Sequence, residues 1–453
     1  MITTDNKTPS PIALMLVLLF VSTAISAQSP GIRTTTAQDP QVRSHAAATT
    51  DALPMDQAPP LYGVQGVLIE TLDSRTIASQ APEIPLNPAS AVKLATALVA
   101  LRSLGPEHRF STGVWTNGSI ERTSGTINGN LYISGRDPSF HDEHAVIIAE
   151  QLNKLGIRTV TGNLIVAPLF TMNFRRSARR SGERLYDTLD ATLRPTEASA
   201  SWNYVRAMQR VNVGAAPVPS VAVMGEVLVK PVDADAKLLF THQSSRLTDV
   251  LKVLLCYSNN FMAERLGDSL GGVRSVERKL NAALPIPAGE FKLSSLSGLG
   301  ANRVTPRAMM IVFRALREEL RKHRLSTTDI MPVAGIDPGT LQDRFTDPAS
   351  RGSVIAKTGT LIRTDGGASS LVGQMRTASG ETLLFVIFNQ RGSVLRFRDN
   401  QDFMIKQVQA SRGGPSAFFY SAQPLTMKLT DTRSRAAESQ EEYEPVVAEQ
   451  SSP

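Results

Sequence analysis

The chain has 453 residues, of which 42% are hydrophobic and 20% are charged, which is enough apolar material for two or three folded units. Its single cysteine, Cys256, excludes an intramolecular disulfide and a cysteine-based metal site. The net charge of +7 is compatible with an anionic cell envelope, but no nucleic-acid motif accompanies it, so no nucleic acid is expected as a partner.

The amino-terminal segment has the pattern of an exported protein. Lys7 precedes an apolar run at 12–21 and small residues at 22–27, which predicts a signal peptide at 1–27 that is cleaved near Ser26 or Ala27. The run is shorter than the roughly 20 residues that span a bilayer, and no later segment is suitable, so no stable membrane span is expected after cleavage. Residues 28–60, rich in Thr, Ala, Gln and Pro, predict a flexible leader.

The next part of the chain begins with a β-hairpin pattern at 63–72 and a short second strand. A helix then starts at Asn87-Pro88-Ala89-Ser90, because the apolar residues after it have helical spacing. Between 113 and 235, short strand-like stretches such as 129–133 and 160–166 are broken by Gly, Asp and Pro. This pattern predicts an inserted β-rich domain.

Helical patterns return after the insert, and strands follow them. Residues 247–266 and 306–323 predict helices. Two alternating stretches, 367–376 and 381–389, predict a strand pair, and a closing helix is expected at 398–410. The interpretation is a discontinuous domain, 61–112 with 236–412, around the insert at 113–235. The final segment, 413–453, resembles the leader in composition, and its acidic run from Glu438 to Glu449 predicts a disordered tail.

The sequence Ser90-Ala91-Val92-Lys93 places a serine and a lysine three residues apart at a predicted helix start. Positions i and i+3 share one side of a helix, so the two side chains can meet. A serine hydroxyl is a weak nucleophile until a base takes its proton, and a desolvated neutral lysine can be that base. By itself the motif also fits a simple helix cap.

Two further polar motifs follow. Ser258-Asn259-Asn260 offers Ser258 as a proton relay and Asn260 as a hydrogen-bonding partner for a lysine or a substrate amide. Lys357-Thr358-Gly359-Thr360 follows an apolar run, which suggests an edge strand where Gly359 allows close approach of a substrate backbone. Lys357 and Thr358 can recognise a carboxylate. Another Ser-x-Asn stands at Ser201-Trp202-Asn203, so this pattern alone selects no site.

Ser-x-x-Lys, Ser-x-Asn and Lys-Thr-Gly in this order are the motif set of the serine penicillin-recognising enzymes. From about Tyr62 to Ala410 the sequence resembles the D-alanyl-D-alanine carboxypeptidases and endopeptidases of the penicillin-binding protein 4 type. Further motifs that carry the resemblance are Ser134-Gly135-Arg136-Asp137-Pro138, Ala263-Glu264-Arg265-Leu266, Met331-Pro332-Val333-Ala334-Gly335-Ile336-Asp337 and Gly367-Ala368-Ser369-Ser370-Leu371-Val372-Gly373. The chain departs at Ser295-Leu296-Ser297-Gly298-Leu299, where the family usually has Asp-Gly-Ser-Gly-Leu.

The resemblance implies an α/β (α+β) fold of the β-lactamase and DD-peptidase type, in which helices flank an antiparallel sheet. It implies that Ser90 attacks the carbonyl of the penultimate D-Ala, that Lys93 takes its proton, and that Ser258 with Lys357 protonates the leaving amine. Asn260 would orient Lys93, and backbone N–H groups of Ser90 and Thr360 would hold the oxyanion.

The resemblance also implies the partners. Thr358 and Thr360, next to Gly359, would bind the terminal carboxylate of a peptidoglycan stem peptide, and β-lactams would acylate Ser90. No metal or organic cofactor is expected, and the location is the periplasm. Carboxypeptidase and endopeptidase use remain open, because both reactions break the bond after a D-Ala carbonyl.

Alternatives remain at this point. Tyr257-Ser258-Asn259 also fits the Tyr-x-Asn of class C β-lactamases, one residue out of register. Gly267-Asp268-Ser269-Leu270-Gly271 matches a nucleophile elbow and an esterase signature, but a helical pattern precedes it and no Asp-x-x-His follows. The segment from His141 to His144 could hold a metal, although a solvated helix start explains it better. A catalytically silent cell-wall binding protein is the non-enzymatic alternative.

Overall fold

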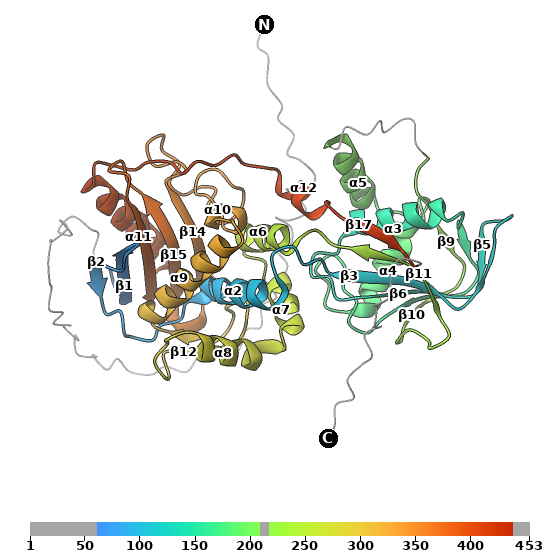
Figure 1. Ribbon diagram of the computed structural model, residues 1–453, viewed down its shortest axis with the longest axis horizontal. Helices are drawn as coiled ribbons and strands as arrows, with labels where there is room; N and C mark the ends of the chain where they lie inside the picture. The colour runs from blue at the N-terminus through green and yellow to red at the C-terminus, as the bar shows by residue number, and fades with distance from the viewer. Residues whose placement is uncertain (1–60, 209–216, 438–453) are drawn as a thin grey trace, which may run out of the picture.

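The computed structural model describes residues 61–208 and 217–437, so the predicted signal peptide and leader lie outside the described residues. In Figure 1 these residues form two lobes, each built on its own sheet. The five-stranded lobe is purely antiparallel, in the order β14-β15-β16-β1-β2. Its strands are β1 (Val64–Thr71), β2 (Thr76–Gln80), β14 (Val354–Leu361), β15 (Ala368–Arg376) and β16 (Thr382–Gln390). The predicted strand pair near the end of the chain is thus confirmed.

Helices cover both faces of this sheet. Neighbouring residues of β1 point to opposite faces, as in any strand, so Leu68 packs with the helices on one side while Val67 and Ile69 pack with α11 on the other. The helices are α2 (Lys93–Leu104), α6 (Leu247–Tyr257), α7 (Asn260–Ser269), α8 (Gly272–Ala283), α9 (Pro306–Lys322), α10 (Thr327–Ile330) and α11 (Val394–Ala410). The predicted fold, an antiparallel sheet flanked by helices, is confirmed.

Helix α2 is the centre of this lobe. Its residues from Lys93 to Leu101 are all buried, because α9, α7, α8 and α6 surround it (Figure 1). A helix that is apolar on every side can only be stable inside a protein core. A short 3-10 turn, η2 (Ala89–Val92), leads into it. Ala89, Ala91 and Val92 of this turn and the first turn of α2 are therefore held by packing.

The helix predicted over 247–266 is two helices in the structure. Helix α6 ends at Tyr257, and Ser258 follows with a left-handed φ of 54°. Asn259 then caps α7 by accepting a hydrogen bond from the backbone N–H of Met262 at 3.0 Å. The apolar periodicity runs through this break because both helices bury their apolar residues in the same core.

The six-stranded lobe has the strand order β10-β8-β6-β3-β11-β17. Its strands are β3 (Ser111–Thr116), β6 (Leu131–Gly135), β8 (Leu164–Val166), β10 (Val227–Val229), β11 (Lys237–Gln243) and β17 (Arg433–Ala436). A second, four-stranded sheet consists of β4 (Ser119–Glu121), β5 (Thr126–Asn128), β7 (Thr159–Val160) and β9 (Ala222–Val223).

This lobe contains more helix than a β-rich insert suggests. It carries α3 (Asp142–Lys154), α4 (Ala178–Leu189) and α5 (Thr196–Met208). The reason is topological: β6 pairs with β8 in parallel, and β8 pairs with β10 in parallel. Parallel neighbours need a long crossover, which is usually helical. The start of α3 is also less solvated than expected, because His144 is buried and its Nε2 lies 2.9 Å from the carbonyl oxygen of Leu429.

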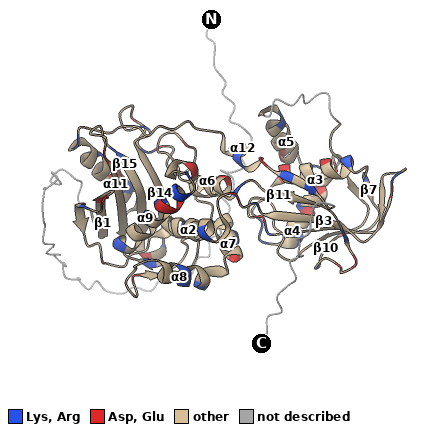
Figure 2. Cartoon of the chain, viewed as in Figure 1, with Lys and Arg blue, Asp and Glu red and all other residues tan. Residues whose placement is uncertain are grey.

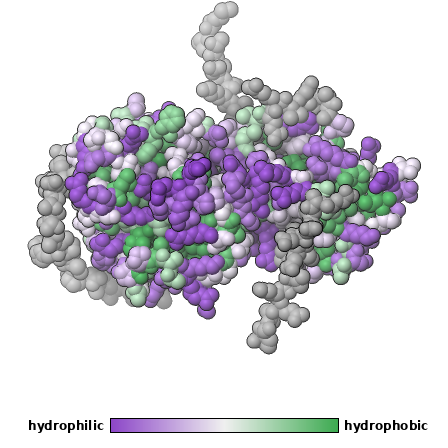
Figure 3. Space-filling model, in the orientation of Figure 1, coloured by the Kyte–Doolittle hydropathy of each residue, from purple (hydrophilic) through white to green (hydrophobic). Residues whose placement is uncertain are grey.

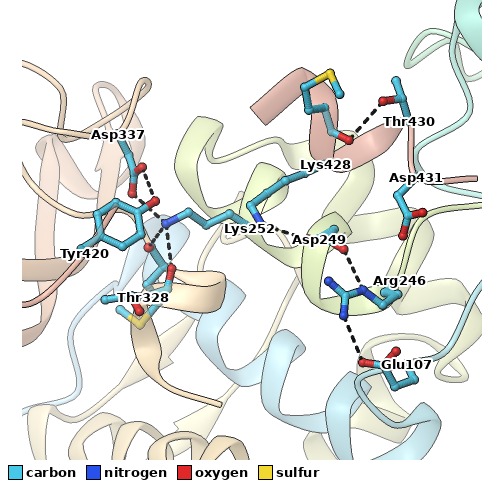
Figure 4. Close-up of polar contacts among 12 residues, drawn as sticks. Glu107, Arg246, Asp249, Lys252, Thr328, Asp337, Tyr420, Lys428, Thr430 and Asp431 are labelled. Atoms are coloured by element: carbon cyan, nitrogen blue, oxygen red, sulfur yellow. Dashed lines mark hydrogen bonds and ion pairs between the residues drawn. The ribbon is translucent and has the colours of Figure 1, made fainter. Parts of the chain in front are cut away.

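Residues 413–437 differ from the expected disordered tail. They contain α12 (Leu425–Leu429), which packs on α6, and β17, which pairs with β11 of the other lobe. Figure 4 shows two polar contacts of this segment: Lys428 bonds Asp249 of α6 at 2.9 Å, and Tyr420 donates at 2.6 Å to Asp337, which itself bonds Lys252 of α6. A few apolar residues and ion pairs thus order a segment whose composition predicts disorder.

The remaining short elements lie near the nucleophile turn. Strands β12 (Phe291–Lys292) and β13 (Arg303–Val304) pair with each other, and a 3-10 turn, η3 (Thr364–Gly366), follows β14. Basic and acidic residues are interspersed over both lobes (Figure 2), and hydrophilic residues cover the middle of the face in Figure 3. Within residues 61–208 and 217–437, no helix has the length and apolar character needed to cross a bilayer.

Candidate active site

The nucleophile candidate Ser90 lies in the η2 turn, one helical turn before Lys93. The backbone of this turn is fixed from two sides: Ala89 donates its N–H to the Asn87 side chain at 3.0 Å, and Ser370 donates its hydroxyl to the Pro88 carbonyl at 2.7 Å. Ser90 itself is only half-buried. Its hydroxyl is thus both fixed in place and accessible to a substrate.

Lys93 is buried, and its ammonium group is surrounded by acceptors. Nζ lies 3.0 Å from Ser90 Oγ and 2.7 Å from Asn260 Oδ1, and it also donates to the Ser297 carbonyl. Burial, followed by the charge of Lys357, lowers the pKa of Lys93 well below its ordinary value. A lysine that loses its proton here has a lone pair within hydrogen-bonding distance of the Ser90 hydroxyl, so it can accept that proton.

Ser258 meets the second lysine of the site. Because its backbone is left-handed between α6 and α7, its hydroxyl reaches Lys357, whose Nζ donates to it at 2.8 Å. The two neighbouring residues have structural roles: Asn259 caps α7, and the Tyr257 ring packs on the helical core. The structure therefore assembles the Ser-x-Asn register and not the Tyr-x-Asn register.

Lys357 lies on β14, at the edge of the five-stranded sheet. Its side chain is fully buried, and Nζ also donates to the Thr358 carbonyl at 2.7 Å. Burial lowers the pKa of Lys357 from 10.5 to about 7. Its proton can therefore be exchanged near neutral pH.

The end of β14 packs directly on the nucleophile turn through Gly359. A Cβ at Gly359 would lie 2.1 Å from Ser370 Oγ and 2.6 Å from the Pro88 carbonyl oxygen, so no larger residue fits. Thr358 is buried beside it and Thr360 is half-exposed. All eight predicted residues are thus connected: Lys93 joins Ser90 to Asn260, Lys357 joins Ser258 to β14, and Gly359 joins Thr358 and Thr360 to η2.

Two contacts of the site were not predicted from sequence. The Ser297 carbonyl, which accepts from Lys93, belongs to the segment where the chain departs from the family pattern. Gly298 next to it has a φ of +89° and packs against the Ala89 carbonyl. Arg398 donates to the Thr360 hydroxyl at 2.8 Å. The sequence signal for Ser297 was that the chain keeps the family's Ser-Gly-Leu at 297–299, whereas no motif marks Arg398.

The rejected candidates lie elsewhere. Ser269 is the last residue of α7, where its hydroxyl bonds the Arg265 carbonyl at 3.4 Å, so it is not on a strand-to-helix elbow. Ser201 lies on α5 and donates to Glu143 at 3.0 Å. Among the described residues, no three His, Cys, Asp or Glu side chains are grouped closely enough to hold a metal ion.

Comparisons with known proteins show which family the chain resembles. The sequence profile of the D-Ala-D-Ala carboxypeptidase 3 (S13) family matches residues 50–181 and 218–410. A carboxypeptidase of Mycobacterium tuberculosis is 27% identical over 383 residues, which cover 77% of this chain and 81% of that protein. The D-alanyl-D-alanine carboxypeptidase DacB of Haemophilus influenzae is 24% identical over 393 residues, covering 66% of this chain and 79% of that protein.

Solved structures show the same fold. A predatory endopeptidase from Bdellovibrio bacteriovorus has a TM-score of 0.67 at 21% identity, covering 80% of this chain and 96% of that one. Penicillin-binding protein 4 of Haemophilus influenzae, in complex with a β-lactam, has a TM-score of 0.56 at 23% identity, covering 78% and 98%. The predicted resemblance is confirmed. Because the family profile matches most of its length, the chain belongs to the D-Ala-D-Ala carboxypeptidase 3 (S13) family.

Proposed function

We propose that this D-Ala-D-Ala carboxypeptidase acts through an acyl-enzyme on Ser90. The observation that supports the proposal is the pairing of each serine hydroxyl with its own buried lysine: Ser90 with Lys93 at 3.0 Å, and Ser258 with Lys357 at 2.8 Å. Burial lowers the pKa of both lysines, that of Lys357 to about 7, so each can give up and regain the proton that a nucleophilic acyl transfer moves at both of its steps.

In the first step, neutral Lys93 takes the proton of Ser90 while Oγ forms a bond to the carbonyl carbon of the penultimate D-Ala. The bond between this carbon and the nitrogen of the terminal D-amino acid then breaks. The leaving nitrogen takes a proton from the Ser258 hydroxyl, and Lys357 replaces that proton. Asn260 holds the Lys93 amine in line with Ser90. In the second step water attacks the resulting ester, and Lys357 takes a proton from that water through Ser258. Lys93 returns its proton to Ser90 Oγ, the shortened peptide is released, and both lysines and Ser90 are restored.

The substrate backbone is proposed to bind along β14. This strand is at the sheet edge, and Gly359 lets its end pack directly against the nucleophile turn. A peptide can add to such an edge through main-chain hydrogen bonds. Backbone N–H groups of Ser90 and Thr360 would hold the oxyanion, and the hydroxyls of Thr358 and Thr360 would bind the terminal carboxylate.

The proposed substrate is the stem peptide of peptidoglycan in the bacterial periplasm, reached after cleavage of the segment 1–27. β-Lactams contain a strained amide that Ser90 would open by the same attack, leaving a stable ester. An endopeptidase reaction would use the same residues, with the cross-linked amino acid of a second stem as the leaving amine. Amino-terminal sequencing of protein recovered from the periplasm tests the location: a start near Gln28 supports it, and an intact Met1 contradicts it.

The decisive experiment is the intact mass of the mature protein after benzylpenicillin, together with D-Ala release from a pentapeptide and the digestion of cross-linked muropeptides. Native protein should gain one penicilloyl group and release D-Ala, and Ser90→Ala should do neither. Ser269→Ala is the matched control and should behave like the native protein, because Ser269 lies in α7 outside the site. Absence of both adduct and release in native protein would instead support the silent wall-binding alternative.

A further inference from the structure

The side chain of Asn87 holds the nucleophile turn and is itself fully buried. Its Oδ1 accepts the backbone N–H of Ala89 at 3.0 Å, and its Nδ2 donates to the Gly300 carbonyl at 2.9 Å. Ala89 has a φ of +45°, in the left-handed region that residues other than glycine seldom adopt. A backbone in such a conformation persists only where its surroundings hold it. The conformation of the residue before Ser90 therefore depends on the orientation of the Asn87 amide.

A carboxylate on a distant loop sets that orientation. The Asn87 Nδ2 also donates to Asp365 Oδ2 at 2.7 Å. Because an amide nitrogen can only donate and a carboxylate can only accept, Asp365 keeps the nitrogen of the amide on its own side and the oxygen on the side of Ala89. Asp365 lies in η3, the turn that follows β14, 278 residues away in the chain. The contact thus joins the nucleophile turn to the loop after the strand on which substrate is proposed to bind.

Arg303, on β13, fixes this carboxylate in place. Its Nη2 donates to Asp365 Oδ1 at 2.7 Å and its Nη1 donates to Oδ2 at 3.0 Å, which makes the contact bidentate. The Asp365 side chain is only 16% exposed. Burial by itself raises the pKa of Asp365, but the hydrogen bond from Asn87 and the Arg303 guanidinium together outweigh burial and hold this pKa below its ordinary value. Asp365 is therefore ionised, and purely an acceptor, at neutral pH.

We propose that Asp365, clamped by Arg303, is a positioning residue for acylation, which keeps the Ser90 hydroxyl in line with its base by orienting the Asn87 amide. The inference rests on the proposed function and adds to it two residues outside the three motifs. Ser90 has to reach the substrate carbonyl while its Oγ stays at 3.0 Å from Lys93 Nζ. A misplacement of roughly 1 Å costs about hundredfold in rate, so a loosened turn slows acylation in a protein that is still folded.

The test exchanges the amide and the carboxylate. Acylation of the mature protein by a fluorescent penicillin is followed by stopped flow, which gives the acylation rate constant, the affinity before acylation and the fraction of protein labelled. Asn87→Asp places two carboxylates against each other and should lower the rate constant about hundredfold. Asp365→Asn leaves one acceptor oxygen where there were two and should lower it about tenfold. The affinity should change less than about threefold in both variants, because the turn acts on the chemical step.

The double variant, Asn87→Asp with Asp365→Asn, restores a donor opposite an acceptor. Its rate constant should be at least about tenfold higher than that of Asn87→Asp alone, because the two side chains contact each other directly. The matched control is Asp347→Asn, which removes a carboxylate of the same lobe that also pairs with a cation, Lys406 at 2.9 Å, outside the site. This control should acylate at the native rate.

The fraction of labelled protein separates positioning from a merely structural role. If Asp365 served only to stabilise the fold, the variants would lower this fraction and leave the rate constant of the labelled protein unchanged, which would overturn the inference. The rate constant is measured on folded protein alone, so partial unfolding of a variant does not obscure it. A double variant no faster than Asn87→Asp would also overturn the inference. If native protein forms no penicilloyl adduct, the proposed function fails first, and the inference fails with it.

Discussion

The Nζ of Lys252 lies 2.7 Å from a carboxylate oxygen of Asp337, and both side chains are completely buried. The same carboxylate accepts the Tyr420 hydroxyl at 2.6 Å (Figure 4). It also accepts the backbone N–H of Val333 at 2.8 Å. Lys252 is on α6, the helix that ends just before Ser258. A buried charge pair therefore joins three distant segments behind the second serine of the site.

This relationship predicts a large effect of Asp337→Asn on stability. The substitution removes the negative charge and leaves the Lys252 ammonium buried beside a neutral amide, which should cost about 3–5 kcal/mol of the free energy of unfolding. Tyr420→Phe keeps the ring over Lys252 and removes one hydrogen bond to a charged group, at about 1.5–3 kcal/mol. Unfolding in guanidinium chloride measures the loss of stability of both variants. An Asp337→Asn midpoint equal to that of native protein would contradict the prediction.

The second prediction concerns pH. Lys93 accepts a proton only when neutral, so the acylation rate should rise with pH as Lys93 loses its proton. The positive charge of Lys357 contributes to the low pKa of Lys93. Lys357→Met removes that charge, so the pKa of Lys93 should rise and the rising limb of the profile should move to higher pH. The residual rate of acylation by a fluorescent penicillin, measured as a function of pH, gives the position of this rising limb. A limb that stays in place or moves to lower pH would rule the coupling out.

The third prediction concerns Gly298. A Cβ at this residue would lie 2.0 Å from the Ala89 carbonyl oxygen and 2.7 Å from the Ser90 nitrogen. Gly298→Ala should displace the nucleophile turn from Lys93 and lower the acylation rate about hundredfold, the usual effect of a misplacement of roughly 1 Å. Gly289→Ala is the control for backbone strain, since Gly289 has a similar φ of +88° and nothing within 4 Å of the added Cβ. Equal acylation rates in the two variants would contradict the steric argument.

The fourth prediction concerns the segment after α11. Leu429 is 7% exposed in the helical core, and Phe419 is 100% exposed. Leu429→Ala should therefore lower the free energy of unfolding by about 2–5 kcal/mol, and Phe419→Ala should change it by less than about 0.5 kcal/mol. Thermal or denaturant unfolding of the two variants tests whether this segment belongs to the folded protein. A Leu429→Ala variant as stable as native protein would show that it does not.

The features that were predicted correctly from the sequence depend on residues that lie close to one another along the chain. The helix after Ser90, the i, i+3 placement of Lys93, and the pairing of β15 with β16 all follow from periodicity and short connections. The order of the three motifs then identified the family. Local patterns are readable because helices and hairpins are stabilised by residues a few positions apart.

Packing between distant segments decided the rest. The downstream motif Ala263-Glu264-Arg265-Leu266 favoured Ser258 over Tyr257 in the sequence, but only the structure shows the left-handed backbone between α6 and α7 from which the Ser258 hydroxyl meets Lys357. The order of residues 413–437 comes from apolar contacts that α12 makes with α6, although its composition resembles that of a disordered tail.

The sequence by itself determined the motif residues, the helix start that brings Ser90 to Lys93, and the family. Only the tertiary structure placed the Ser297 carbonyl on Lys93, which is 204 residues away, and Arg398 on Thr360, which is 38 residues away. Such contacts carry no periodic signal, since they depend on how whole elements pack in three dimensions and not on spacing along the chain.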